Sequence, residues 1–186
     1  MNGNKVLLIL TDGFEEIEAF GTFAILRRSN IDVDIYSLKR SNIEGRYGLK
    51  LNNYKVISED SNFNLDSYNT LFIAGGPEYK ELEDSIEFKD IILDFNSKHK
   101  LIAAICAGPT ILGHLGLLKN KKYTCFKSMN EDFGGTFIDT YVVEDDNIIT
   151  GISASATIDF AFKIVSYLKG KDYAEEVKNS IYYYDK

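Results

Sequence analysis

Three short, continuously apolar segments, each ending abruptly at small or turn-forming residues, constrain the fold of this chain more than any other feature. They are KVLLIL at Lys5–Leu10, TLFIA at Thr70–Ala74 and LIAAI at Leu101–Ile105. Segments of this length with no polar alternation are typical of strands buried on both faces. Segments with helical spacing of apolar residues, such as Ile158–Leu168, alternate with them. This order predicts an α/β protein with a mainly parallel central sheet covered by helices on both faces.

The segments between these runs predict the remaining elements. After the first run, Glu15 begins a helix in which Ile17, Phe20 and Ala24 recur at helical spacing and form the expected apolar face. The run at Leu101–Ile105 is the most continuously apolar, so we expect it at the centre of the sheet. We also expect strands or hairpins at Ile31–Leu38, Glu44–Ile57, Tyr123–Phe126 and Asp139–Thr150, and helices at Tyr79–His99, Ala107–Leu117, Ile158–Leu168 and Tyr173–Tyr182.

The size, charge and cysteine content of the chain limit its organisation and partners. Its 186 residues match the usual size of one domain and contain no linker or repeat, so we expect a single domain over residues 1–186. A net charge of −7 works against an obligate nucleic-acid partner. We find no apolar run that could cross a membrane and no signal peptide, which predicts a cytoplasmic protein. Two cysteines without metal-ligand spacing predict neither a disulfide framework nor a metal site, and no motif indicates a cofactor.

The segment AICAGPT at Ala104–Thr110 places Cys106 between an apolar strand and a helix that begins with small residues. A sharp strand-to-helix turn of this kind exposes the nucleophile of many hydrolases. The free N–H groups and dipole of the helix N-terminus favour a thiolate, so we expect the pKa of Cys106 to lie below its ordinary value. The alternative is a buried and inert cysteine at a strand end.

Two other strand ends point to the same edge of the sheet, where ligands of parallel sheets bind. Gly75 and Gly76 follow one strand and could present backbone N–H groups to an anion, although most such pairs are simple turns. Glu15 and Glu18 follow another strand and share a helix face, so either one could reach the thiol as a protonated general acid. The alternative role of these carboxylates is to complement the helix dipole.

A Cys-His dyad is not expected from this sequence. His99 precedes the Leu101–Ile105 strand and so belongs at its far end, and His114 lies about two helical turns, or ~12 Å, beyond Cys106. Cys125 follows on a later strand, where it is either a core residue or a resolving partner for an oxidised Cys106.

Over essentially its whole length the chain resembles the ThiJ/PfpI superfamily, in the branch of the Parkinsonism-associated deglycase and its bacterial relatives. The resemblance rests on five motifs in the order and spacing of the family. They are DGFEEIEA at Asp12–Ala19, LRRSNIDV at Leu26–Val33, FIAGGP at Phe72–Pro77, IAAICAGPTIL at Ile102–Leu112 and ATIDFAFKIV at Ala156–Val165. This resemblance implies a flavodoxin-like three-layer sandwich of the class I glutamine amidotransferase type and a homodimer.

The resemblance also implies roles for individual residues. Cys106 corresponds to the reactive nucleophile, Glu18 to its protonated carboxyl partner and Glu15 to a second acid of the pocket. The backbone anion site is assigned to Gly75, Gly76 and Ala107, and polar positions near the pocket and the dimer contact are assigned to Arg28 and Arg46.

The chain departs from its relatives at three positions of the expected pocket. The protease-like branch has histidine directly after the nucleophile, whereas this chain has Ala107, which counts against peptidase activity. Close relatives have a pocket histidine where this chain has Phe126, and a Gly-Pro-Gly loop where it has Ala154–Ala156. Loss of a general base could lower turnover while leaving the oxidation chemistry of the thiolate intact.

Two functions follow from the resemblance. The first is a cofactor-free glyoxalase or deglycase that protects against stress by acting on small reactive carbonyls or glycated substrates, converting methylglyoxal to lactate. The second is a non-enzymatic redox sensor or chaperone that oxidation of Cys106 switches. A role in thiamine synthesis, which the family name suggests, ranks last because the sequence has no matching cofactor motif.

Overall fold

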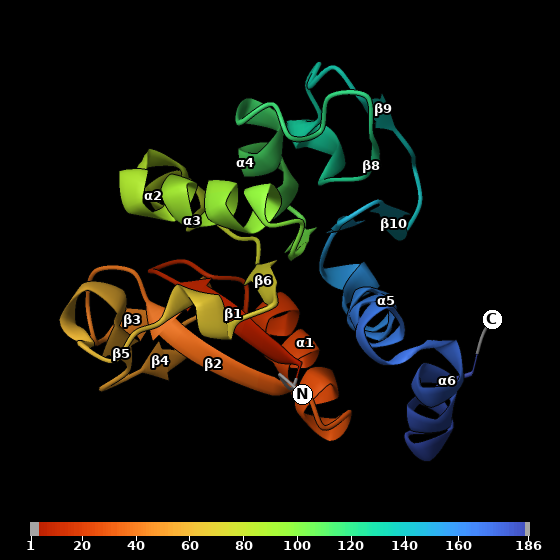
Figure 1. Cartoon of the computed structure of the whole chain (residues 1–186), viewed down its shortest axis with the longest axis horizontal. Helices are drawn as coiled ribbons and strands as arrows, with labels where there is room; N and C mark the ends of the chain where they lie inside the picture. Colours follow the sequence, from red (N-terminus) through yellow and green to blue (C-terminus); the bar gives the residue numbers. More distant parts are fainter. Residues whose placement is uncertain (1–3, 185–186) are drawn as a thin grey trace.

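The computed structural model describes residues 4–184 and shows a flavodoxin-like α/β fold built on a mixed, mainly parallel sheet (Figure 1). The seven-stranded sheet has the order β10-β11-β7-β6-β1-β2-β5, and only the β10–β11 pair is antiparallel. Its strands are β1 (Lys5–Leu10), β2 (Asp32–Ser37), β5 (Lys55–Val56), β6 (Thr70–Ile73), β7 (Leu101–Ile105), β10 (Val142–Asp145) and β11 (Ile148–Gly151). Two small sheets pair β3 (Ile43–Glu44) with β4 (Lys50–Leu51), and β8 (Lys122–Tyr123) with β9 (Thr136–Phe137).

Helices cover both faces of the sheet and complete two hydrophobic cores. On one face, side chains of β1, β6 and β7 pack against α1 (Thr22–Arg28), α5 (Thr157–Lys169) and α6 (Lys171–Ser180). On the other face, alternate residues of the same strands pack against α2 (Tyr79–Asp84), α3 (Ile86–Ser97) and α4 (Gly108–His114). Figure 1 shows α2, α3 and α4 on the opposite side of β1 and β6 from α1. The predicted three-layer arrangement is therefore confirmed.

Single helical or 3₁₀ turns complete the chain. A π-helical turn occupies Ile17–Gly21 immediately before α1. The 3₁₀ turns lie at Ile57–Glu59, Leu65–Ser67, Lys127–Met129 and Ala154–Ala156. Among residues 4–184, no helix is both long and apolar enough to cross a membrane.

The helix that follows β1 turns a different face to the core from the one its spacing predicts. Ile17 is 59% exposed, Ala24 is exposed and Phe20 is only half-buried. The buried positions are instead Glu18, Ala19, Thr22, Ile25 and Leu26. The π-helical turn rotates the chain at this point, and the carboxyl of Glu18 is directed inward. Of the three residues at helical spacing, Ile17 and Ala24 therefore lie on the surface, whereas Phe20 packs against the core while remaining partly exposed.

Two other expectations need correction. The strand expected at Tyr123–Phe126 is reduced to the two residues of β8, because Phe126 turns away to pair through its N–H with the carbonyl of Cys106. The Leu101–Ile105 strand is fully buried as expected, but it lies between β6 and β11, and the central strand of the sheet is β6. Parallel pairing to both neighbours explains why its sequence is continuously apolar.

Candidate active site

Cys106 lies on the predicted elbow between β7 and α4. Its φ angle of +63° is in the left-handed region, which non-glycine residues rarely adopt and which is often found at functional sites. The N–H of Cys106 donates to the carbonyl of Gly151 at 2.9 Å, and its carbonyl accepts from the N–H of Phe126 at 2.8 Å. Both flanking segments therefore hold the strained residue in place, and its side chain remains partly exposed.

Small residues around the elbow allow the backbone segments to approach closely. A Cβ atom at Gly75 would lie 2.6 Å from Cβ of Cys106 and 3.1 Å from the backbone nitrogen of Ala107. A Cβ atom at Gly108 would lie 3.0 Å from the carbonyl oxygen of Ile73, at the end of β6. The predicted need for small residues beside the nucleophile is therefore visible as direct contact between the ends of β6 and β7.

Glu18 is the carboxylate that reaches the cysteine. Its side chain is fully buried, interacts electrostatically with the thiol of Cys106, and accepts the N–H of Gly75 on Oε2 at 2.8 Å. The other oxygen, Oε1, is buried and accepts no N–H or O–H group from the described residues. Burial raises the pKa of Glu18 from its ordinary value of 4.5 to about 7, and the nearby charge of Glu15 acts in the same direction. A protonated Oε1 can donate a hydrogen bond to the sulfur.

The thiol of Cys106 does not have the lowered pKa that its position before a helix predicts. Burial raises the pKa of Cys106 above its ordinary value, and the carboxylate of Glu18 raises it further. The N–H of Ala107 hydrogen-bonds to the sulfur and acts in the opposite direction, but it is outweighed. Desolvation and a neighbouring negative charge therefore raise the pKa of Cys106 by more than the N-terminus of this short helix lowers it.

The two groups are best described as a pair that shares one proton. Because the pKa of Glu18 is raised to about 7, its carboxyl can be protonated near neutral pH, and protonation removes the charge that opposes ionisation of Cys106. The carboxyl proton can then be donated to a thiolate, which the Ala107 N–H also stabilises. The pair is thus equipped to supply a nucleophile and an adjacent proton donor near pH 7.

Glu15 supports Glu18 through its backbone and, among the described residues, is not hydrogen-bonded to the sulfur. Oε2 of Glu15 accepts the backbone N–H of Glu18 at 2.8 Å, and the N–H of Glu15 donates to the carbonyl of Gly75 at 2.9 Å. The side chain is only 6% exposed, and its charge raises the pKa values of Glu18 and Cys106. The shared helix face is confirmed, and of the two candidates only Glu18 touches the thiol.

The three residues of the expected backbone anion site have different roles in the structure. The Ala107 N–H points to the sulfur, whereas the Gly75 N–H is already bonded to Glu18. Gly76 has a φ of +99°, and a Cβ there would lie 2.7 Å from the nitrogen of Glu15. Gly76 therefore lets two loops pack together, while Ala107 is the residue with an N–H directed at the reacting atom.

The remaining predicted residues lie at different distances from the pair. Arg46 is exposed, and its charge lowers the pKa of Glu18, which places the guanidinium within electrostatic reach of the carboxyl. Arg28 is exposed in the last turn of α1, about 15 Å along the helix axis from Glu18, and is not brought to Cys106 within one protomer. Phe126 is joined to Cys106 through its backbone, and its ring is 43% exposed.

Two further glutamates shape the site but were not singled out from the sequence. Glu16 accepts the N–H of Tyr47 at 2.7 Å and so anchors the loop that carries Arg46. Glu78 is buried, accepts the N–H of Thr11 at 2.7 Å, and has a pKa well above its ordinary value because of burial. Neither glutamate lies in a periodic apolar pattern of the sequence. Only Glu16 is marked at all, by the acidic segment at positions 15–18.

The two cysteines belong to opposite faces of the sheet. Cys106 packs against the core that α1 and α5 cover, and Cys125 is a fully buried member of the core that α3 and α4 cover. Burial raises the pKa of Cys125 to about 11. Cys125 is therefore placed as a core residue, and its side chain is separated from Cys106 by the sheet.

The histidines lie away from the pair, as expected. His114 is bound between Glu83 and Glu131, and His99 forms a 3.1 Å ion pair with Asp146. Within the described part of the chain, no cluster of three or more His, Cys, Asp or Glu side chains could hold a metal ion.

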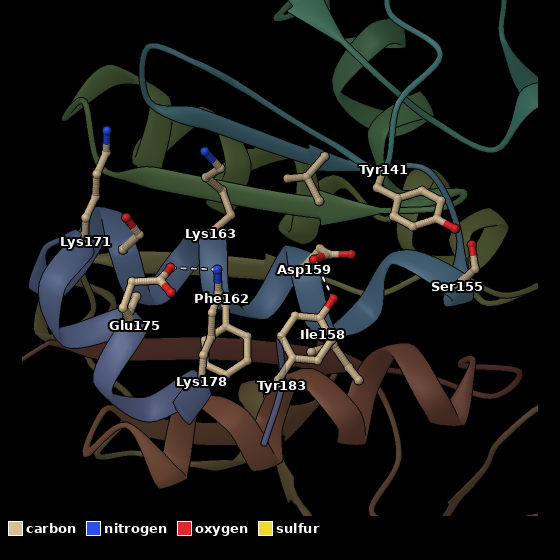
Figure 2. A pocket seen from close by; sticks show the side chains of 13 residues that line it. Tyr141, Ser155, Ile158, Asp159, Phe162, Lys163, Lys171, Glu175, Lys178 and Tyr183 are labelled. Atoms are coloured by element: carbon tan, nitrogen blue, oxygen red, sulfur yellow. Dashed lines mark hydrogen bonds and ion pairs between the residues drawn. The ribbon is translucent and has the colours of Figure 1, made fainter. Parts of the chain in front are cut away.

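Two cavities lie on the Cys106 side of the sheet. A cavity of about 840 Å³ runs along α5 and α6, and Figure 2 shows Tyr141 and Ser155 at one end of it and Lys171 at the other. A second cavity of about 530 Å³ shares Tyr141 and Ser155 with the first and is also lined by Phe126 and Ile152. Of these two cavities, only the second is lined by a residue, Phe126, whose backbone hydrogen-bonds to Cys106.

Comparison with known proteins gives a consistent picture. A model described as the DJ-1/PfpI family matches residues 4–167. The chain is 32% identical to the protein DJ-1alpha of Drosophila melanogaster over 185 residues, covering 95% of this chain and 83% of that protein. It is 28% identical over 149 residues to the deglycase PYRAB04690 of Pyrococcus abyssi, covering 78% and 88%. The solved structure of oxidized Toxoplasma gondii DJ-1 has a TM-score of 0.87 and 27% identity, covering 98% of this chain and all of that one.

Proposed function

Because the chain belongs to the DJ-1/PfpI family, we propose that it acts without a cofactor on small reactive carbonyls, as a glyoxalase or deglycase that uses Cys106. The observation that carries this proposal is the buried carboxyl of Glu18, held by the N–H of Gly75 within electrostatic reach of the Cys106 thiol. Relatives named deglycases in Pyrococcus support the same class of reaction. In this role the protein would protect cells from carbonyl stress.

The proposed reaction starts with attack of the Cys106 thiolate on the aldehyde carbon of methylglyoxal. A carbon–sulfur bond forms, and the carbonyl oxygen takes the proton of Glu18 to give a hemithioacetal. The Glu18 carboxylate then removes the proton from the former aldehyde carbon to give an enediol and returns it to the neighbouring carbon, while the hydroxyl proton of the first carbon passes to the oxygen of the second. That step oxidises the first carbon to a thioester and reduces the second to an alcohol. Water hydrolyses the thioester, releasing lactate and the thiol.

The same addition chemistry extends to early glycation adducts. A hemithioacetal or aminocarbinol formed between methylglyoxal and a cellular thiol or amine releases free methylglyoxal reversibly, and Cys106 would consume it. Partial exposure of Cys106 and burial of Glu18 suit a small substrate that reaches the sulfur while its partner acid stays shielded from water. Glycated substrates are therefore proposed alongside free α-oxoaldehydes.

The second candidate function is a redox sensor or chaperone without turnover. It is favoured by Phe126, which lies beside Cys106 where a histidine could have served as an additional base. The Toxoplasma relative was solved in an oxidized form, which supports oxidation chemistry in this family. In this alternative, oxidation of Cys106 is itself the signal, and partner proteins recognise the oxidised form.

Incubation of the purified protein with methylglyoxal separates the two candidates. We expect lactate to form in the presence of the wild-type protein and not with Cys106→Ser, which retains the volume of the site but lacks the thiolate. Absence of lactate above the Cys106→Ser background would remove the enzymatic proposal and leave the redox function.

We also propose a cytoplasmic homodimer. The outward face of the helix after β1 carries Ile17, Phe20 and Ala24, and Ile17 is 59% exposed. A second copy packed on this face would bury these side chains and shield the neighbouring Glu15–Glu18 segment. Arg28 lies at the end of the same helix, where it could contact the partner.

A further inference from the structure

The cavity lined by Phe126, Tyr141 and Ile152, here called the Phe126 cavity, has no role in the chemistry described so far. Its volume of about 530 Å³ is within the range of small-molecule sites. Phe126 and Tyr141 are 43% and 55% exposed, which is high for large aromatic residues that line a hollow. Exposed aromatic surface that converges on a cavity is typical of a ligand site.

The Phe126 cavity is joined directly to the nucleophile by backbone hydrogen bonds. The N–H of Phe126 donates to the carbonyl of Cys106, and Gly151, which precedes Ile152, accepts the N–H of Cys106. Two walls of the cavity are therefore fixed to the residue that carries the sulfur.

The cavity and the cysteine also share one face of the sheet. Tyr141 and Ser155 line both the Phe126 cavity and the cavity along α5, where Figure 2 shows them beside Ile158 and Asp159. Helix α5 covers the core against which Cys106 packs. The Phe126 cavity thus lies on the Cys106 side, whereas Cys125 belongs to the opposite face.

The charge at the rim favours a neutral occupant. Lys127 and Asp139 line the cavity and form an ion pair of 2.8 Å with each other, so that their charges cancel. The other polar groups of the lining are uncharged hydroxyls of serine, threonine and tyrosine. An apolar substituent would bury the exposed faces of Phe126 and Tyr141 without displacing an unpaired charge.

We infer that the Phe126 cavity binds the apolar substituent of the carbonyl compound that reacts with Cys106, so that the favoured substrates are α-oxoaldehydes with an aryl or branched alkyl group. This inference rests on the proposed function and names the substrate class of the same site. Phenylglyoxal represents the class, with its ring in the Phe126 cavity and its aldehyde carbon at the sulfur. Methylglyoxal has only a methyl group and leaves the cavity empty.

Alkylation of Cys106 tests the cavity without requiring turnover. Iodoacetamide and N-benzyliodoacetamide carry the same reactive carbon. The thiolate attacks this carbon in both reagents, and iodide leaves. We expect wild-type Cys106 to react about 10-fold faster with the benzyl reagent, after correction for the rates of both with a free thiol, because the ring removes apolar surface from water. In Phe126→Ala, and independently in Tyr141→Ala, this preference should fall below about 3-fold.

Leu93→Ala is the matched control, because Leu93 on α3 is 43% exposed like Phe126 but lies outside the cavity. It should keep the wild-type preference. Equal rates of the two reagents with the wild-type protein would overturn the inference, and so would an unchanged preference in folded Phe126→Ala and Tyr141→Ala. A Cys106 that neither reagent labels would overturn it as well.

A turnover measurement separates this inference from the proposed function. Mandelate formed from phenylglyoxal and lactate formed from methylglyoxal are compared at equal substrate concentration, with kcat/KM expected to favour phenylglyoxal. A benzyl preference in labelling without either hydroxy acid would support the cavity and reject the enzymatic function. Both hydroxy acids formed with equal kcat/KM, and no benzyl preference, would support the enzymatic function and reject the cavity.

Discussion

The N–H of Gly75 donates a 2.8 Å hydrogen bond to Oε2 of Glu18, in the space that a side chain at position 75 would fill. The same side chain would lie 2.6 Å from Cβ of Cys106. The end of β6 thus holds the acid and the nucleophile at once. Loss of this glycine should therefore disturb both groups.

We expect Gly75→Ala to lower the free energy of unfolding by about 1–3 kcal/mol, the usual cost of overpacking, and to slow alkylation of Cys106 at pH 7. Urea unfolding and labelling with iodoacetamide measure the two effects. Gly116→Ala is the control, because its φ of +74° makes an added Cβ destabilising through backbone strain alone, while no atom lies within 4 Å of that Cβ. Labelling of Cys106 that is as fast in Gly75→Ala as in Gly116→Ala would contradict the assigned role of Gly75.

The pKa of Glu18 predicts a pH dependence of stability. Burial raises this pKa from 4.5 to about 7 in the folded protein, so the stabilising contribution of the protonated form is complete below pH 4.5 and is lost as the pH rises through about 7. A shift of this size corresponds to roughly 3 kcal/mol. Urea unfolding at pH 5 and pH 8 should therefore show a smaller loss of stability in Glu18→Gln than in the wild-type protein. Equal losses in the two proteins would show that Glu18 does not titrate in this range.

Mild peroxide should convert Cys106 to its sulfinate while Cys125 stays reduced. Each of two peroxide molecules transfers one oxygen to the sulfur and is reduced to water, and the Ala107 N–H and protonated Glu18 can hold the sulfinate oxygens. Cys125 is fully buried, so peroxide has no access to its sulfur, whereas Cys106 is partly exposed. Peptide mass spectrometry after graded peroxide measures both sites.

The position of the two cysteines on opposite faces of the sheet also predicts that no Cys106–Cys125 disulfide precedes the sulfinate. Cys125→Ser provides the control and should oxidise at Cys106 as the wild-type protein does. A disulfide that forms before any product with two added oxygen atoms would establish a two-cysteine switch instead.

Light scattering at micromolar concentration should give about twice the chain mass of 21.0 kDa. Ile17→Lys places a charge on the proposed interface and should produce a monomer. Ile86→Lys is the control, since Ile86 is 76% exposed on α3 and should leave the dimer intact. A monomeric wild-type protein, or a dimer that Ile17→Lys does not weaken, would reject the interface.

The sequence predicts the elbow well and its electrostatics poorly. The order of strand, cysteine and small residues is local, and so the strained turn at Cys106 and the close approach at Gly108 follow from residue types alone. The pKa of Cys106 depends on burial and on the carboxyl of Glu18, which approaches from another strand end. The position of Cys106 at a helix N-terminus alone therefore predicts the wrong direction for the shift of its pKa.

The helix after β1 shows a second limit of sequence analysis. Helical spacing identifies Ile17, Phe20 and Ala24 as one apolar face, but spacing does not say whether such a face meets the core or another molecule. The buried position in the site is taken by Glu18, a residue type that is rarely buried without a functional reason. Glu78 was missed for the same reason, because no periodicity marks a buried carboxyl.

The account depends most directly on Glu18 as the proton partner of Cys106, and the rate of iodoacetamide labelling of Cys106 as a function of pH tests it. In the wild-type protein the rate should rise near pH 7, where the pair loses its first proton. Glu18→Leu removes the group that titrates near pH 7 together with the carboxyl proton that is donated to the thiolate, so the rise near pH 7 should disappear and the rate at pH 7 should fall about 10-fold. Glu15→Gln removes only a neighbouring charge and should change the profile less. An unchanged profile in Glu18→Leu, or a larger change in Glu15→Gln, would contradict the assignment.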